Sequence, residues 1–423
     1  MKLGLLGSDA RIAGVVAAAA RRGDSVVVAC DLPAGPVPFP PGVEPRREAS
    51  WEAVVDPQVC DAILVGVDGW TEGRGDAVRA LVQAGRTLLV SHPATLSMLW
   101  AYELDMIRSD AGGRLVPFLP DRLHPFVEKL RAEVEAGLGG AGRLGAIESI
   151  AMERRLVDRS RESVLSALAR DVDLVRVIAG EPGRLSTLGA ADAAAASAWS
   201  TLAVGLSGPA LVPVRWQVAR GDEPGLEITL HHGGGTIRVE APDDERPWRW
   251  DGVAAAPSDF DRGAAMLGVL HGEPPAGEIA AATWPDAARA IELAETVPRS
   301  LAKGRAIDLH QEEFSELGTF RGTMASLGCG LVLAALLVLL VATLLGGIAR
   351  EAGWELGERI AGAWPQVVLA VLGLFLALQV LPLLVDDRRP QRGRAGDDGR
   401  EGSRRPDAAA STAASTRGPE RKS

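Results

Sequence analysis

The first turn of the chain carries residues whose types bear on phosphate and ribose binding. Gly7-Ser8-Asp9-Ala10-Arg11-Ile12 follows an apolar run, at the place where a dinucleotide-binding fold has Gly-x-Gly-x-x-Gly. Only Gly7 is retained, and the carboxylate of Asp9 is expected to repel phosphate at a helix N-terminus. Asp31, 24 positions after Gly7, has the placement of the acid that hydrogen-bonds ribose and favours NAD over NADP. The alternative is an aspartate that only solvates a turn.

The histidines indicate proton transfer at one position and no metal site. His92 ends an apolar run and could move a proton near neutral pH, because the pKa of free histidine is about 6.5. The alternative is an inert loop histidine. The six histidines show no metal-ligand spacing, and the neighbours His231 and His232 would point to opposite faces of a strand. No phosphate-binding loop of the Gly-x-x-x-x-Gly-Lys type occurs.

The composition limits the classes of partner and compartment. The formal net charge is -10, and an acidic body argues against nucleic acid as the main partner. Three cysteines, Cys30, Cys60 and Cys329, predict no disulfide framework and fit a reducing compartment. Met1 opens directly onto a strand-like run, so no secretory signal is expected.

Residues 1–120 alternate short apolar runs with helical segments, which predicts a doubly wound parallel sheet of the Rossmann type. The expected strands are residues 3–6, 25–29, 62–67, 87–90 and 115–119. An alanine-rich helix is expected up to Arg21, and the clearest later helices are residues 75–84 and 96–109.

Residues 121–315 predict a second α+β domain with an open, mostly antiparallel sheet. The glycines at 233–235 join two of its strands as a hairpin. The expected strands are residues 144–157, 212–220, 226–232 and 236–240, and the expected helices are residues 161–179, 260–270 and 285–301.

The C-terminal part predicts a membrane hairpin. Residues 322–349 and 360–385 are uncharged and long enough to span a bilayer as two helices; two buried core helices are the alternative. Arginines flank the outer ends of both runs, so the positive-inside bias places the soluble domains and the tail in the cytoplasm and the connector 350–359 outside. Residues 386–423 are expected to be a disordered arginine-rich tail that touches lipid weakly.

Residues 1–309 resemble the Gfo/Idh/MocA oxidoreductases, the group of glucose-fructose oxidoreductase and inositol dehydrogenase. The resemblance rests on the order of short segments: Trp51-Glu52-Ala53-Val54-Val55, Ala84-Gly85-Arg86-Thr87-Leu88-Leu89-Val90 with Ser91-His92-Pro93, Gly180-Glu181-Pro182, the run from Trp284-Pro285-Asp286 to Ala294, and Arg305-Ala306-Ile307-Asp308-Leu309. It implies NAD or NADP bound by Gly7, Ser8, Asp9, Ala10, Arg11, Ile12, Asp31, Val67 and Ser91. It also implies pairing of copies through the second domain.

The resemblance assigns the catalytic positions, and all three depart from the family. The family uses the Lys of a Glu-Lys-Pro tripeptide, and an Asp and a His four positions apart on the second domain's first helix. Here His92 stands at the Lys, Ser166 at the Asp and Arg170 at the His. A shift of one residue would bring Asp171 or Asp173 into play. Arg122 and His124 match a segment that lines the family's substrate cleft, or else they cap a buried turn.

Two functions follow. The first is a membrane-anchored oxidoreductase that transfers hydride between NAD(P) and a sugar, polyol or similar carbinol, with His92 as acid/base. The second is a catalytically silent protein that keeps the fold to bind a ligand or partner at the membrane. The lost glycines and catalytic residues motivate the second. A transporter is disfavoured, because the two apolar runs contain no charge to form a pathway.

Overall fold

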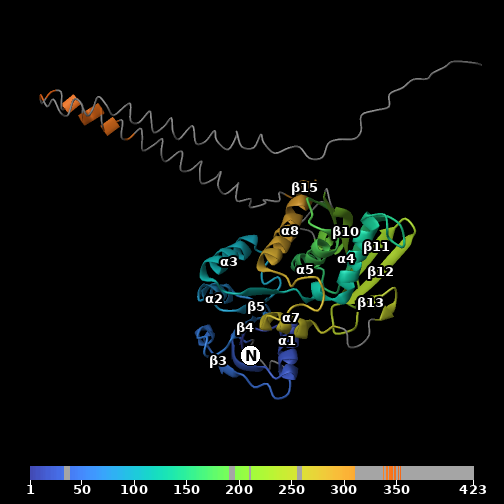
Figure 1. The fold of residues 1–423 in the computed structure, drawn as a ribbon, viewed down its shortest axis with the longest axis horizontal. Coiled ribbons are helices and arrows are strands. Elements are labelled where there is room, and N and C mark those ends of the chain that lie inside the picture. Colours follow the sequence, from blue (N-terminus) through green and yellow to red (C-terminus); the bar gives the residue numbers. More distant parts are fainter. Residues whose placement is uncertain are drawn as a thin grey trace, which may run out of the picture. The chain divides into compact units, whose positions relative to one another are not determined.

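The computed structural model describes residues 1–32, 39–189, 196–208, 211–254 and 260–309, and scattered helical residues between 337 and 353. Residues Met1–Gln311 form one compact unit, and Glu312–Ser423 form another. Both sheets of the molecule belong to the first unit (Figure 1).

The first sheet is six-stranded and entirely parallel, in the order β3-β2-β1-β4-β5-β6. Its central strands are buried on both faces, as their continuous apolar sequences predict. The strands are β1 Lys2–Leu6, β2 Ser25–Cys30, β3 Arg46–Glu48, β4 Ala62–Val65, β5 Leu88–Ser91 and β6 Leu115–Phe118. The predicted Rossmann-type sheet is therefore confirmed, and the short edge strand β3 is an addition.

Helices cover both faces of this sheet. On one face, α1 (Ala10–Arg22) packs with α7 (Arg262–His271), which returns from the second half of the chain. On the other face lie α2 (Glu72–Gln83) and α3 (Met98–Ala111) with the short helix η1 (Trp51–Val54). The helical layers on the two faces of the sheet thus combine segments that are far apart in the sequence.

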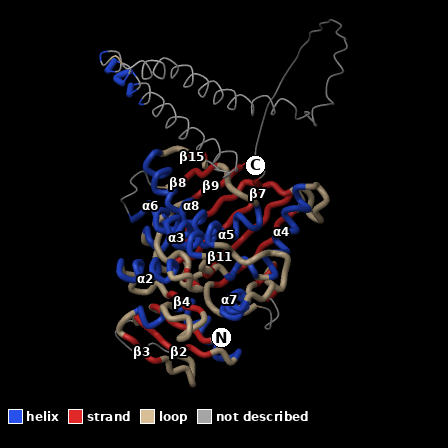
Figure 2. Tube along the Cα trace, turned by 60° about the vertical axis from the view of Figure 1, so that its left-hand side comes forward, coloured by secondary structure: helices blue, strands red, loops and turns tan. Residues whose placement is uncertain are grey.

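The second sheet has nine strands in the order β14-β13-β12-β11-β7-β10-β9-β8-β15, and Figure 2 shows its strands apart from those of the first sheet. Only β7 and β10 are parallel neighbours, so the predicted mostly antiparallel sheet is confirmed. The strands are β7 Ile147–Leu156, β8 Arg184–Leu188, β9 Ala203–Gly208, β10 Leu211–Arg220, β11 Gly225–His232, β12 Gly235–Pro242, β13 Arg249–Trp250, β14 Val253–Ala254 and β15 Ile307–Asp308.

One face of the second sheet carries the large core that includes α5 (Arg161–Ala179). Helix α5 packs against α4 (Pro125–Leu138), α8 (Trp284–Lys303) and the short helix η2 (Pro120–Leu123), while α6 (Ala196–Ser200) lies nearby. Most of α5 is buried, including Asp171 and Asp173. A buried helix that carries charges needs partners for them, and these partners define much of the site.

The two predicted membrane segments and the tail lie almost entirely outside the described residues. Among the residues that the structure does describe, no helix is long and apolar enough to cross a bilayer. The hairpin and its orientation therefore stay predictions.

Candidate functional site

The turn between β1 and α1 is closed by its own aspartate. Asp9 is the N-cap of α1, and its Oδ1 accepts hydrogen bonds from the backbone N–H groups of Arg11 and Ile12, both at 2.9 Å. Its Oδ2 accepts a third from the N–H of Val67, also at 2.9 Å. The N–H groups of Arg11 and Ile12 are of the kind that the N-terminus of a helix offers to a phosphate. A carboxylate of the protein has taken that role.

Arg74 fills the space beside this turn. Thr71 caps the start of α2, so Arg74 lies in the first turn of that helix, and its side chain is almost fully buried. Its Nε donates to Oδ2 of Asp31 at 2.6 Å. Its Nη1 donates to the carbonyl oxygens of Gly66 (3.0 Å) and Asp68 (2.9 Å). The acid predicted to bind ribose is therefore held by a guanidinium of the same chain.

The turn leaves no room between itself and β4. A Cβ on Gly7 would lie 2.6 Å from Cζ of Arg74, and a Cβ on Gly66 would lie 2.4 Å from Cα of Ser8. The predicted cofactor residues, which run from Gly7 to Ile12 and include Asp31, Val67 and Ser91, do gather near this edge. The carboxylates of Asp9 and Asp31, however, are hydrogen-bonded within the protein, whereas the buried hydroxyl of Ser91 has no partner among the described residues. The residues present do not fit a dinucleotide held in the usual way at this turn.

His92 lies at the same edge, directly after β5. Its peptide bond to Pro93 is cis, and the residue is 2% exposed. Burial, with the positive charges of Arg170 and Arg11, lowers the pKa of His92 to about 3. Nε2 has no hydrogen-bond partner among the described residues. The imidazole is thus neutral at physiological pH, and its low pKa makes it a weak proton acceptor there.

Arg170 and Ser166 lie one helical turn apart on α5, as their spacing predicts. The guanidinium of Arg170 makes no hydrogen bond or ion pair with any described residue. Burial and the positive charges of Arg11 and Arg154 lower its pKa to about 9. We call the place where Arg11, His92 and Arg170 meet the sheet–α5 junction.

The neighbouring acids of α5 are committed to structural ion pairs. Arg154 of β7 binds Asp171 through two hydrogen bonds and also pairs with Asp243, while Nε1 of Trp216 donates to Asp171 at 2.8 Å. Asp173 lies 3.3 Å from Nε of Arg122, and burial raises its pKa to about 6. Neither acid is free to replace the family's catalytic aspartate.

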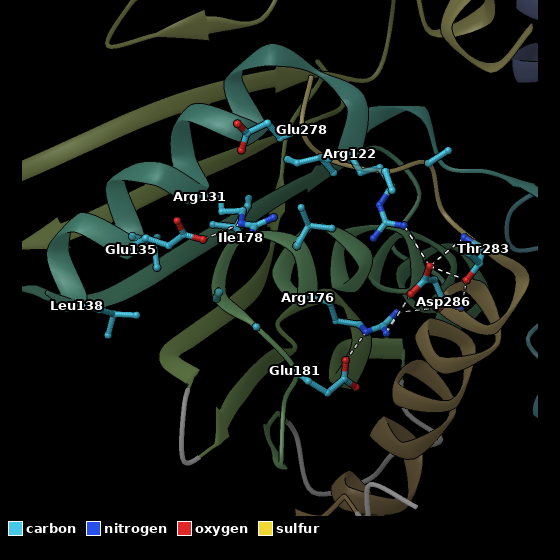
Figure 3. A pocket seen from close by; sticks show the side chains of 17 residues that line it. Arg122, Arg131, Glu135, Leu138, Arg176, Ile178, Glu181, Glu278, Thr283 and Asp286 are labelled. Atoms are coloured by element: carbon cyan, nitrogen blue, oxygen red, sulfur yellow. Dashed lines mark hydrogen bonds and ion pairs between the residues drawn. The ribbon is translucent and has the colours of Figure 1, made fainter. Parts of the chain in front are cut away.

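A pocket of about 650 Å³ opens between α4, the end of α5 and the segment before α8 (Figure 3). Arg122 lines it, and its Nη1 lies 3.3 Å from Oδ2 of Asp286. Arg176 pairs with both Asp286 (3.2 Å) and Glu181 (2.5 Å). In Figure 3 these side chains point toward one another. The pocket is therefore polar but internally neutralised.

His124 does not line this pocket. Its ring stacks on Trp248 at a centroid distance of 4.0 Å, and its Nδ1 accepts a hydrogen bond from the N–H of Phe126 at 3.0 Å. Of the two predicted cleft residues, the structure thus places Arg122 at a pocket and His124 in an aromatic cluster that begins α4. Sequence reasoning missed Arg74 and Arg154, both of which stand in amphipathic segments like many solvated arginines.

Comparison with solved structures gives the fold, while no protein-family model and no curated protein sequence matches the chain. A putative myo-inositol dehydrogenase from Sinorhizobium meliloti is 17% identical with a TM-score of 0.53, over 73% of this chain and 100% of that one. The WlbA dehydrogenase from Bordetella pertussis, in complex with NADH and UDP-GlcNAcA, is 17% identical with a TM-score of 0.55, over 74% and 99%. An oxidoreductase from Agrobacterium radiobacter, in complex with NAD+, L-tartaric acid and magnesium, is 16% identical with a TM-score of 0.51, over 73% and 98%. Residues of the first compact unit therefore have the two-sheet fold of these dehydrogenases.

Proposed function

We propose that this protein keeps a dehydrogenase fold to bind a small molecule at the sheet–α5 junction, without a nicotinamide dinucleotide as hydride carrier. One observation carries the proposal: Asp9 and Arg74 of the chain occupy the N–H groups and the ribose-binding acid of the first turn. A dinucleotide would have to displace the hydrogen-bonded carboxylate of Asp9 and compete with Arg74 for Asp31, whose side chain is half-exposed.

The junction also lacks a suitable acid/base. Hydride transfer to or from a carbinol needs a group that moves the hydroxyl proton in step with the hydride. His92 is neutral, buried and poorly basic, Arg170 is a cation without a proton to exchange near neutral pH, and Ser166 has no base hydrogen-bonded to it among the described residues. These groups are better suited to binding a ligand than to transferring a proton.

The second candidate is an NAD(P)-dependent oxidoreductase acting on a sugar-like or polyol substrate. Its support is the fold shared with dehydrogenases solved with NADH or NAD+. If a cofactor binds, the placement of Asp31 favours NAD over NADP, provided that the carboxylate leaves Arg74.

A hydride-exchange assay separates the two candidates. The full-length chain is incubated with NADH deuterated at the transferable position and with myo-inositol, D-glucose and their oxidised forms. The proposal expects no deuterium in any product and none lost from the cofactor beyond a protein-free control. Exchange that is abolished in His92→Ala would overturn the proposal and establish the oxidoreductase.

We also propose that residues 322–349 and 360–385 anchor the protein, with the body and the tail on the cytoplasmic side. Their support is the length of the two uncharged runs and the arginines that flank them. A cysteine introduced in the connector 350–359 should react with an impermeant thiol reagent added outside intact cells, and one in the tail should not. The opposite labelling would reverse the orientation, and labelling of neither cysteine would contradict the membrane-spanning hairpin.

A further inference from the structure

Two arginines at the sheet–α5 junction have no acidic partner. No carboxylate of the described residues lies within ion-pair distance of Arg11 or Arg170, and the one side-chain hydrogen bond of Arg11 goes to the backbone oxygen of His92 at 3.0 Å. Of the buried arginines, Arg74, Arg122 and Arg154 each hold at least one carboxylate. Arg86 donates instead to the carbonyl oxygen of Cys60.

The two guanidinium groups serve the same small region. Arg11, in the first turn of α1, donates to the backbone oxygen of His92. The positive charge of Arg170 on α5 lowers the pKa of His92, and the charge of Arg11 lowers the pKa of Arg170. The acids that could neutralise Arg170 are Asp171 and Asp243, and both are bound by Arg154. His92 adds a nearly fully buried ring nitrogen without a hydrogen-bond partner.

Such an arrangement costs stability unless something else supplies negative charge. Two like charges that are partly removed from water repel each other, and each loses hydration without gaining a counter-ion. Binding sites commonly retain groups of this kind because a ligand satisfies them. The guanidinium fork matches a carboxylate or phosphate group through paired hydrogen bonds.

We propose that Arg11 and Arg170 together bind the anionic group, carboxylate or phosphate, of the small molecule that occupies the junction. This inference rests on the proposed binding function and names the chemical class of its ligand. Nε2 of the neutral His92 can accept a hydrogen bond from a hydroxyl group of that ligand without adding charge. The neutralised pocket at Arg122 and Arg176 has no comparable demand for an anion.

Calorimetric titration of the full-length chain tests this. The probes are D-glucuronate for a carboxylate, inorganic phosphate for a phosphate, and D-glucose as the neutral analogue of glucuronate. At least one anion should bind at least tenfold more tightly than D-glucose. Arg11→Gln and Arg170→Gln should each weaken that binding at least tenfold, whereas Arg299→Gln, an exposed arginine of α8, should leave it unchanged. The identity of the anion that binds distinguishes the two sources.

A melting experiment without any ligand separates binding from structure. Arg170→Gln should raise the melting temperature of the ligand-free chain, because it removes an unpaired charge, and should abolish the rise that the anion gives to the wild type. A lower melting temperature in Arg170→Gln would mean that this arginine has a structural role and would overturn the inference.

The remaining outcomes distinguish a failure of the anion site from a failure of the proposed function. Equal binding of glucuronate and glucose, or no binding of either anion at millimolar concentration, overturns the anion site but leaves the absence of hydride transfer standing. Deuterium exchange from NADH overturns the proposed function itself, whatever the anions do.

Discussion

The β1–α1 turn contains Asp9, and the sheet–α5 junction contains Arg11, only two positions further along the chain. The charged groups of the two regions nevertheless differ in whether they have partners of opposite charge or hydrogen-bonding groups. At the turn, Asp9 is satisfied by three backbone N–H groups, and Asp31 by Arg74. At the junction, neither Arg11 nor Arg170 has a carboxylate of the described residues within ion-pair distance, and Arg11 donates to the backbone oxygen of His92. The charges of the first region are satisfied within the protein, whereas those of the second are not paired with acids among the described residues.

The contrast bears on which of the two regions can accept a ligand. A polar group that the protein satisfies internally contributes to folding and is not free for a ligand. An unpaired charge removed from water costs stability, and a ligand of opposite charge removes that cost. The fold alone would assign both regions to the same dinucleotide-dependent reaction, which is why the site and not the fold decides the function.

The largest loss of stability is expected when a buried arginine that is paired with carboxylates is replaced. Arg154→Gln leaves Asp171 buried without its counter-ion, so the free energy of unfolding should fall by about 3–5 kcal/mol. Urea unfolding of the full-length chain measures this. Arg249→Gln, a half-exposed arginine paired with Glu240 at 3.5 Å, serves as the control and should change stability by less than about 1 kcal/mol. Similar losses in both variants would mean that burial does not separate the two classes of arginine.

His92 should make stability depend on pH in the acid range. Its pKa is lowered from 6.5 to about 3 in the folded protein, so the unfolded chain binds the extra proton between these values. The free energy of unfolding should therefore fall as the pH is lowered from about 6.5 toward 3, by up to a few kcal/mol. His92→Gln lacks this contribution, so the difference between wild type and variant should change across that window and be constant above pH 7 or so.

The titration of Asp173 changes the free energy of unfolding in the opposite direction, so its contribution has to be removed from the comparison. Its pKa is raised to about 6, so the folded state binds the extra proton and gains stability as the pH falls. Because Asp173 is present in both proteins, the wild-type-minus-His92→Gln difference removes it. A difference that does not vary with pH would show that His92 is solvated, and the junction would then be open rather than buried.

A smaller effect is expected at the cap of α1. Asp9→Ala removes the side chain that accepts from the first N–H groups of the helix and should reduce the free energy of unfolding by about 1–2 kcal/mol. Asp9→Asn keeps a capping oxygen and should lose less. A loss as large in Asn as in Ala would assign the effect to the third bond, with the N–H of Val67.

The helices and strands were predicted well where the apolar residues follow a single helical or strand pattern. The apolar runs at β1, β2, β4, β5 and β6 and the helix Arg161–Ala179 were expected nearly where they occur. The elements not predicted were short or mixed, such as β3, β8, β9 and α4, whose existence depends on neighbours contributed by distant residues.

The partners of the candidate site residues could not be predicted. Arg74 and Asp31 are separated by 43 positions and meet only because β2 and β4 flank β1. An arginine in the first turn of an amphipathic helix is usually solvated, so nothing local marks Arg74 as the residue that occupies the site. The lack of a partner at Arg170 is likewise a property of the whole neighbourhood, since Arg154 has taken the nearby acids.

The most direct test of the account is a fluorescence titration of NADH into the full-length wild type and into the double variant Asp9→Gly/Arg74→Ala. The account predicts no saturable binding to the wild type at millimolar NADH, and binding to the double variant, in which the first-turn N–H groups and Asp31 are released. Saturable submillimolar binding of NADH to the wild type, unchanged in the variant, would contradict it.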